Sequence, residues 1–123
     1  MNKRQVGASY EKLAADYLCA QGYEIITCNF RCRNGEIDLI AREEEYLCFV
    51  EEEYLCFVEV KYRAGTGCGS PLEAVTWHKR QNILKVARYY LMRNGLRMDT
   101  PCRFDVVAVC GQEITLIRNA FGE

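Results

Sequence analysis

Apolar residues in the first part of the chain recur at intervals of three and four positions. Between Val6 and Ala20 this pattern falls on Tyr10, Leu13, Ala14, Tyr17 and Leu18. The spacing predicts an amphipathic helix, and Gly22 marks its end. Glu11 borders the same face, so we expect its carboxylate at the edge of the core rather than in bulk water.

Alternating apolar and polar residues predict five strands further along the chain, at 24–29, 36–41, 54–63, 104–109 and 113–117. In the second of these, strand periodicity places Glu36, Asp38 and Ile40 on one face. It places Ile37, Leu39 and Ala41 on the other.

A second helix is predicted between the third and fourth strands. Its apolar face is formed by Ile83, Leu84, Val86, Ala87, Tyr90 and Leu91. It could begin at Ser70, in a segment that resembles a capping box, or at Thr76, and Gly95 marks its end. The order αβββαββ predicts an α/β fold in which a mixed sheet is flanked by helices.

One octapeptide occurs twice in tandem, as residues 43–50 and again as 51–58. Only the second copy runs into Glu59-Val60-Lys61, and an even shift keeps every side chain on its own face of a sheet. A single strand from Tyr46 to Arg63 would be unusually long, at roughly 60 Å. We therefore expect a break or a loop at 51–53. The spare copy could add an edge strand or exchange strands with a second chain, giving a homodimer.

The length of 123 residues fits one domain spanning 1–123. No apolar run reaches the length of a signal sequence or a membrane span, which predicts a cytoplasmic protein with no membrane partner. Eight cysteines accompany a single histidine, without a Cys-x-x-Cys pair. We expect free thiols, several of them buried as small hydrophobes. A zinc site that includes Cys28 and Cys32 is the less favoured alternative.

The net charge of −1 hides two oppositely charged segments. Residues 36–59 hold nine acids and one base, whereas residues 61–103 hold nine bases and two acids. This layout is typical of a protein that holds metal ions beside a polyanion. Two solvated faces of opposite sign would explain it equally well.

Three residues in the second and third strands carry the candidate chemistry. Glu59 and Lys61 are two positions apart and therefore share a face, and Asp38 can lie opposite them on the neighbouring strand. Two carboxylates favour Mg²⁺ or Mn²⁺, beside which Lys61 could orient a water or stabilise developing negative charge. Glu11 could complete the site. The plain alternative is a cross-strand salt bridge between Asp38 and Lys61.

Several runs of residues resemble the YraN-like family of bacterial proteins. They are Gly7-x3-Glu11-x2-Ala14, Gly22-Tyr23, Gly35 to Ala41, Phe57 to Arg63, Pro71-x-Glu73-Ala74-Val75 and Arg103 to Val107. That family resembles Holliday-junction resolvases and other PD-(D/E)xK nucleases. The resemblance implies a restriction-endonuclease-like core and catalytic roles for Glu11, Asp38, Glu59 and Lys61, with Asp38 and Glu59 as metal ligands. The duplication before Glu59 departs from the family pattern.

Basic residues after the site are candidates for contacts to nucleic acid, namely Arg63, Lys79, Arg80, Lys85 and Arg88. A solvated helix face would carry such residues too. Tyr62 and Trp77 could stack on unpaired bases, although core packing is favoured for both. Asp105 matches a family position, and a buried acid that caps a turn explains it equally well.

The leading hypothesis is a metal-dependent nuclease that hydrolyses phosphodiester bonds in DNA, including branched DNA. Two alternatives stay open. The protein could be a nucleic-acid-binding module that does not cut, or it could be a partner-binding protein with the same fold.

Overall fold

A computed structural model of the chain describes residues 3–47, 50–63, 67–70, 73 and 75–122. The elements follow the predicted order αβββαββ. They are α1 (Lys3–Ala20), β1 (Glu24–Cys32), β2 (Gly35–Leu47), β3 (Val50–Arg63), α2 (Trp77–Arg93), β4 (Cys102–Cys110) and β5 (Glu113–Phe121).

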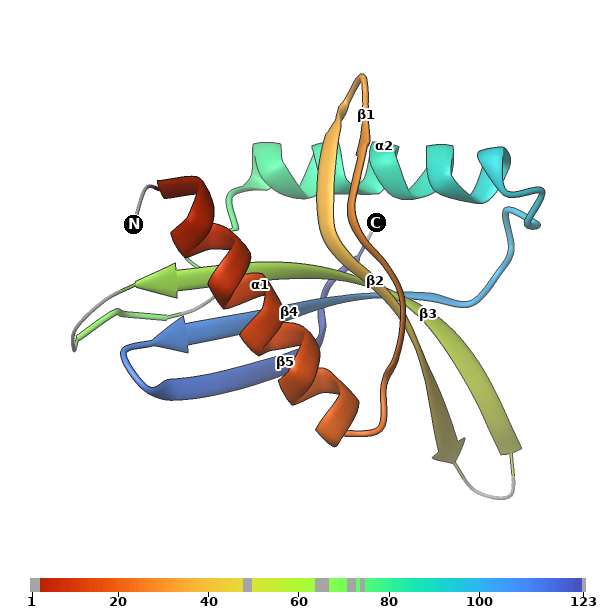
Figure 1. Cartoon of the computed structure of the whole chain (residues 1–123). Helices are drawn as coiled ribbons and strands as arrows, with labels where there is room; N and C mark the ends of the chain where they lie inside the picture. The colour runs from red at the N-terminus through yellow and green to blue at the C-terminus, as the bar shows by residue number, and fades with distance from the viewer. Residues whose placement is uncertain (1–2, 48–49, 64–66, 71–72, 74, 123) are drawn as a thin grey trace.

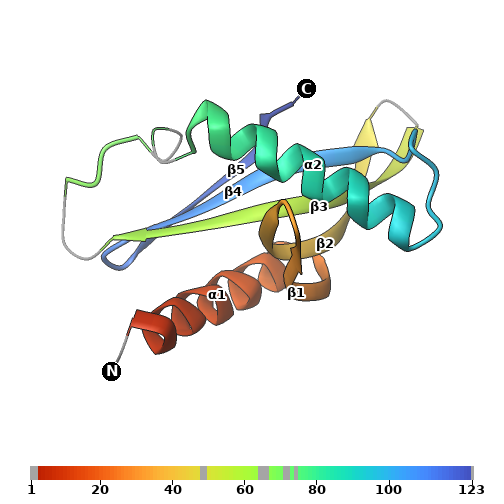
Figure 2. The same cartoon turned by 90° about the horizontal axis from the view of Figure 1, so that it is seen from above.

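The strands form one open sheet in the order β1-β2-β3-β4-β5. Neighbouring strands run antiparallel except β3 and β4, which are parallel. A parallel pair needs a crossover connection, and α2 supplies it. Figure 2 shows α1 and α2 on opposite sides of the sheet. Among the described residues, neither helix is long and apolar enough to cross a lipid bilayer.

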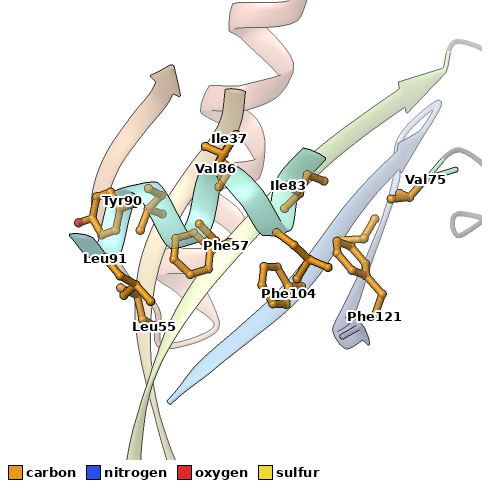
Figure 3. Packing of buried hydrophobic residues seen from close by; sticks show 14 residues of the cluster. Ile37, Leu55, Phe57, Val75, Ile83, Val86, Tyr90, Leu91, Phe104 and Phe121 are labelled. Carbon is orange, nitrogen blue, oxygen red and sulfur yellow. The ribbon is translucent and has the colours of Figure 1, made fainter. Parts of the chain in front are cut away.

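The core under α2 fixes that helix over the middle of the sheet. All six residues of the predicted apolar face are buried. They pack on a row of stacked rings, in which the Phe57 and Phe104 centroids are 5.6 Å apart and those of Phe104 and Phe121 are 5.2 Å apart (Figure 3). Thr76 is the N-cap of α2, so the predicted start at Ser70 is wrong and the start at Thr76 is confirmed.

A second core lies between α1 and the other face of the sheet. Ala14 and Leu18 are fully buried there against β2, β3 and β4, whereas Leu13 is 43% exposed and does not belong to the buried face. Ile37 was predicted to share a face with Leu39, yet it packs in the α2 core. Strict alternation therefore fails in this part of β2, because Ile37 and Leu39 lie in different cores.

The first halves of the two octapeptide copies pair with each other in antiparallel register, which lengthens one hairpin. These pairs run from Glu43 with Tyr54 to Tyr46 with Glu51, and a pair within the first copy, Leu47 with Val50, follows them. The predicted break at 51–53 is therefore wrong, because β3 runs through these residues without interruption. We call residues 43–47 and 50–54 the arm. It extends past the ends of its neighbours, since β1 pairs only as far as Arg42 and β4 only from Leu55 onward (Figure 1).

One cysteine pair corrects the expectation of free thiols. Cys68 and Cys110 form a disulfide across 42 positions, with their Cα atoms 6.1 Å apart. It ties the segment 67–70 to the end of β4. Cys19, Cys28, Cys32 and Cys56 are free thiols, and Cys56 is buried as a small hydrophobe.

A candidate metal centre where two strands separate

The candidate site lies at the fork where β2 leaves β3. Their pairing ends at Leu39 opposite Val58. Beyond this pair, β2 turns away together with β1 while β3 continues along β4 (Figure 1). The backbone amide of Val60 then has no main-chain acceptor in β2. It donates instead to the side-chain Oδ2 of Asp38 at 2.8 Å. The Asp38 carboxylate thus takes the place of a main-chain acceptor, as buried amides require.

Asp38 and Glu59 bring two carboxylates into this fork. Asp38 is 9% exposed and Glu59 is 4% exposed. Burial, together with the charges of Glu59 and Glu11, raises the pKa of Asp38 to about 7. A cation bound beside Asp38 would offset this effect, because a nearby positive charge favours the ionised carboxylate.

Two amines meet the same oxygen of Glu59. Lys61 Nζ lies 3.3 Å from Glu59 Oε1, and Lys79 Nζ lies 2.6 Å from it. In the part of the chain that the structure describes, Lys61 pairs with Glu59 and not with Asp38, so the predicted cross-strand bridge is wrong. Burial and the neighbouring Lys79 lower the pKa of Lys61. Burial pulls the pKa of Lys79 down, but its hydrogen bond to Glu59 outweighs this and raises it.

Glu11 approaches the fork from α1. Its neighbour Tyr10 stacks on Tyr62 of β3, with ring centroids 4.3 Å apart. This contact anchors the helix beside the strand that carries Glu59 and Lys61. Glu11 acts on Asp38 through its charge, which raises the pKa of that acid. The structure thus brings Glu11 to the margin of the group that Asp38, Glu59 and Lys61 form.

The donor set fits a hard divalent ion better than zinc. Within the described ranges, no three histidine, cysteine, aspartate or glutamate side chains converge closely enough to hold an ion. Mg²⁺ does not need such a cage, because it commonly binds one or two carboxylates and keeps several waters. Asp38 and Glu59 together match that requirement. Structural zinc sites instead use four cysteine or histidine ligands in a closed tetrahedron.

A cleft of about 310 Å³ adjoins the site. It is lined by the ends of β3 and β4, the start of β5 and residues 67–70 of the loop that follows β3. Lys61 and Arg63 lie on its wall, and so do Gly69 and Ser70. The disulfide of Cys110 holds this loop segment in place. Sequence reasoning did not find this wall, because no cysteine spacing signals the pairing.

The predicted basic residues do not form one surface. Lys79 lies inside the carboxylate site and Arg63 lines the cleft. Arg80 instead donates to the carbonyl of Val75 at 3.0 Å. Lys85 and Arg88 are exposed farther along α2 and are not brought to the fork.

Aromatic residues near the site differ from the expectation of core packing. Trp77 is 73% exposed at the first position of α2, and Tyr62 is 39% exposed. Both are therefore accessible to a ligand.

Sequence reasoning also missed Lys79 as a partner of Glu59. The available signal was a cation in the first turn of a helix, where the helix dipole favours acids.

Asp105 belongs to a different polar cluster on the α1 side. It is fully buried and accepts hydrogen bonds from Arg103, Tyr23 and the backbone amide of Asn119. Arg103 in turn pairs with Glu43. Every buried polar group here has a partner, so the cluster ties β4 to β2 and β5 and is structural.

Comparison with known proteins assigns the chain to a family. A UPF0102 protein of Lachnoclostridium phytofermentans is 50% identical over 121 residues, covering 98% of this chain and 96% of that protein. A UPF0102 protein of Acetivibrio thermocellus is 43% identical over 130 residues, covering 98% and 93%. Residues 10–109 match the family described as "Uncharacterised protein family UPF0102". The chain therefore belongs to the UPF0102 family.

Proposed function

We propose that this protein is a metal-dependent nuclease that hydrolyses phosphodiester bonds in DNA, with branched or otherwise structured DNA as the preferred substrate. The observation that carries the proposal is the fork itself. There Asp38 and Glu59 lie buried together with the amine of Lys61 beside Glu59. The similarity to PD-(D/E)xK nucleases, which rests on the same residues, supports this assignment.

Asp38 and Glu59 would hold Mg²⁺ or Mn²⁺, which supplies charge neutralisation and a more acidic bound water. Lys61 is positioned to stabilise negative charge on a phosphate oxygen in the cleft that it lines. Glu11 would orient the attacking water from the α1 side. In the reaction, water forms a new bond to phosphorus, one bridging phosphorus–oxygen bond breaks, and the leaving oxygen takes up a proton.

Local charge and exposed rings support a nucleic-acid substrate. Lys61 and Arg63 place two cations along the cleft, whose lining also includes Glu73 and Glu113, and these two cations would meet phosphate groups. Trp77 is exposed at the start of the same helix that carries Lys79. Stacking of an unpaired base on Trp77 would favour DNA that contains single-stranded segments or junctions.

A nucleic-acid-binding module that does not cut is the second candidate. It is favoured by the ammonium groups of Lys61 and Lys79, which already neutralise Glu59. In that case the site would need no metal, and Asp38 would serve only to end the β2–β3 pairing.

The two candidates separate in one cleavage experiment. The full chain is incubated with supercoiled plasmid, a four-way junction and single-stranded DNA, each with Mg²⁺, with Mn²⁺ or with chelator. We expect metal-dependent cleavage that Asp38→Asn and Lys61→Met abolish while DNA binding is retained. DNA binding by the wild type without cleavage under any of these conditions would favour the binding module. Equal cleavage by Asp38→Asn would reveal a contaminating nuclease.

A further inference from the structure

Lys79 occupies a position that its own helix disfavours. It stands in the first turn of α2, where Thr76 Oγ1 accepts the Lys79 amide hydrogen bond at 3.2 Å. That turn holds no acidic residue. A cation at a helix N-terminus opposes the helix dipole. The local placement is unfavourable, and a residue that breaks a local rule is a candidate for function.

The compensation comes from β3, across the site. The Lys79 ammonium lies 2.6 Å from Glu59 Oε1, closer than that of Lys61 at 3.3 Å. Lys61 sits two residues from Glu59 on the same strand, so its backbone is fixed beside the acid. Lys79 reaches the acid from a different element, and its side chain is 39% exposed. Of the two amines, the Lys79 ammonium is therefore the one that can move away from Glu59 toward solvent.

A divalent ion and the Lys79 ammonium would compete for the negative charge of Glu59. Both amines bind Oε1 of this acid, and Lys79 is the closer of the two. An ion held by Asp38 and Glu59 would lie beside the Lys79 ammonium, and two cations that share one carboxylate repel each other. Binding of the ion therefore disfavours the contact between Lys79 and Glu59.

We propose that Lys79 is a displaceable counter-ion of the metal site. In the metal-free protein its ammonium neutralises Glu59 and holds the two buried acids together. An arriving divalent ion takes over this role and displaces the ammonium from Glu59. This inference rests on the proposed metal site, and it assigns Lys79 a positioning role that is distinct from the phosphate contact predicted from the sequence.

A purely structural tether makes the opposite prediction. If Lys79 only fastened α2 to β3, its removal would leave the ion's ligands unchanged or more mobile, and metal affinity would stay the same or fall. A displaceable counter-ion competes with the metal, so its removal must raise metal affinity. The sign of the change therefore distinguishes the two roles.

The test measures Mn²⁺ binding to the full chain by isothermal titration calorimetry, at pH 7.5 and without DNA. We expect Lys79→Met and Lys79→Gln to bind Mn²⁺ about five-fold more tightly than the wild type, because a competing like charge has been removed. Lys79→Arg, which keeps the charge, should not gain affinity. Lys85→Met, on the exposed part of the same helix, should match the wild type. Two neutral variants are included in case one fails to fold, as judged by circular dichroism.

The outcomes separate this inference from the proposed function. Wild-type binding with equal or weaker binding by the folded neutral variants overturns the counter-ion role and leaves the metal site standing. Failure of the wild type and of every Lys79 variant to bind Mn²⁺ overturns both. Binding that Asp38→Asn abolishes and Lys79→Met strengthens supports both.

Discussion

Asp38 is a single residue that lowers the stability of the metal-free protein and provides a candidate metal ligand. Its carboxylate satisfies the Val60 amide, but it lies buried beside another acid. Burial raises its pKa from an ordinary 3.8 to about 7. Between these two values the folded chain binds a proton that the unfolded chain has lost, so the stability of the metal-free protein falls as pH rises through this interval.

Asp38→Asn should therefore stabilise the metal-free protein at pH 8. One unit of pKa corresponds to about 1.4 kcal/mol, and we expect a melting temperature at least about 4 °C above the wild type. The difference in melting temperature should shrink as pH is lowered toward 4, because Asp38 of the folded wild type is then protonated and as uncharged as the asparagine of the variant. Thermal melts in chelator across this range measure it, with the exposed Asp16→Asn as the matched control. A variant that melts below the wild type at pH 8 would contradict the account.

Asp105 is also buried, but unlike Asp38 it stabilises the fold, because its neighbours are hydrogen-bond donors. Asp105→Asn should destabilise the protein by about 3–5 kcal/mol, since Arg103 would lose a buried partner. Urea unfolding measures this. Glu45→Gln removes a more exposed partner of the same arginine, 3.5 Å away, and should cost less than about 1 kcal/mol. Equal losses in the two variants would refute the structural role of Asp105.

The sequence allowed prediction of those site residues whose geometry follows from strand periodicity. Glu59 and Lys61 share a face because they are two apart, and Asp38 reaches them through hairpin pairing. Lys79 was predicted to contact phosphate, because its place beside Glu59 depends on how α2 packs on the sheet. The cation in the first turn of that helix was a local signal, but it does not identify the partner. Glu43 and Glu51 hold the same place in their repeats, yet among the described residues Glu43 and not Glu51 pairs with Arg103. This difference arises from strand pairing and not from the residues of the repeat.

At the scale of elements, the hairpin of β2 and β3 accommodates the duplication without moving any side chain to the other face of the sheet. Eight residues inserted at the tip of a hairpin add four to each strand, and four is even, so no side chain changes face. The pairing of Leu39 with Val58 at the base of the fork is therefore compatible with the insertion. This explains why the site survives a repeat that directly precedes it. The break predicted at 51–53 was wrong because the first copy was available as a partner for the second.

Deleting one copy should leave the site intact. The arm is a two-stranded ribbon in which Glu44 faces Glu53 and Glu45 faces Glu52, and like charges in such pairs are unfavourable. We expect the deletion variant to melt at or above the wild-type temperature and to bind Mn²⁺ within about two-fold of it. A loss of metal binding would mean that the arm supports the fork. As a control, deleting seven residues should unfold or inactivate the protein, because an odd change swaps faces.

The disulfide is the second element-scale feature that the sequence did not reveal. Closing a loop of 42 positions corresponds to roughly 4 kcal/mol in the chain-entropy estimate. Cys68→Ala should therefore lower the melting temperature under oxidising conditions, and dithiothreitol should lower that of the wild type to match. Cys28→Ala, which removes an exposed free thiol, should have little effect. A wild type that is insensitive to dithiothreitol would show that the pair contributes no stability.

Across the whole molecule, the acidic segment found in the sequence divides into two unrelated parts. Six of the nine acids in residues 36–59 are the glutamates of the repeated copies, at 43–45 and 51–53. Only Asp38 and Glu59 of the remaining three lie at the fork, since Glu36 pairs with Arg31 at 2.6 Å. The acidic character of this segment therefore comes mostly from glutamates of the arm, three of which the duplication adds, rather than from the candidate site.

The fork draws on both helices and the central strands at once. Glu11 reaches it from α1 on one side of the sheet, and Lys79 reaches it from α2 on the other. Strand patterns give only the residues in between, which is why the helical contributions were predicted incompletely.

With a net charge of −1, the proposed binding to DNA would depend on the few cations beside the cleft rather than on the overall charge. Arg63 lines that cleft, whereas Lys85 is exposed elsewhere on α2. Arg63→Gln should therefore weaken binding to all DNA sequences alike and reduce the slope of log affinity against log salt by about 1, the value for one lost phosphate contact. Lys85→Gln should change neither. Fluorescence anisotropy of a labelled junction in Ca²⁺ between 25 and 200 mM salt, roughly the range over which such contacts are resolved, gives both slopes. If the two variants lose affinity equally, DNA lies along α2 instead of entering at the fork, and the phosphate could not reach Lys61.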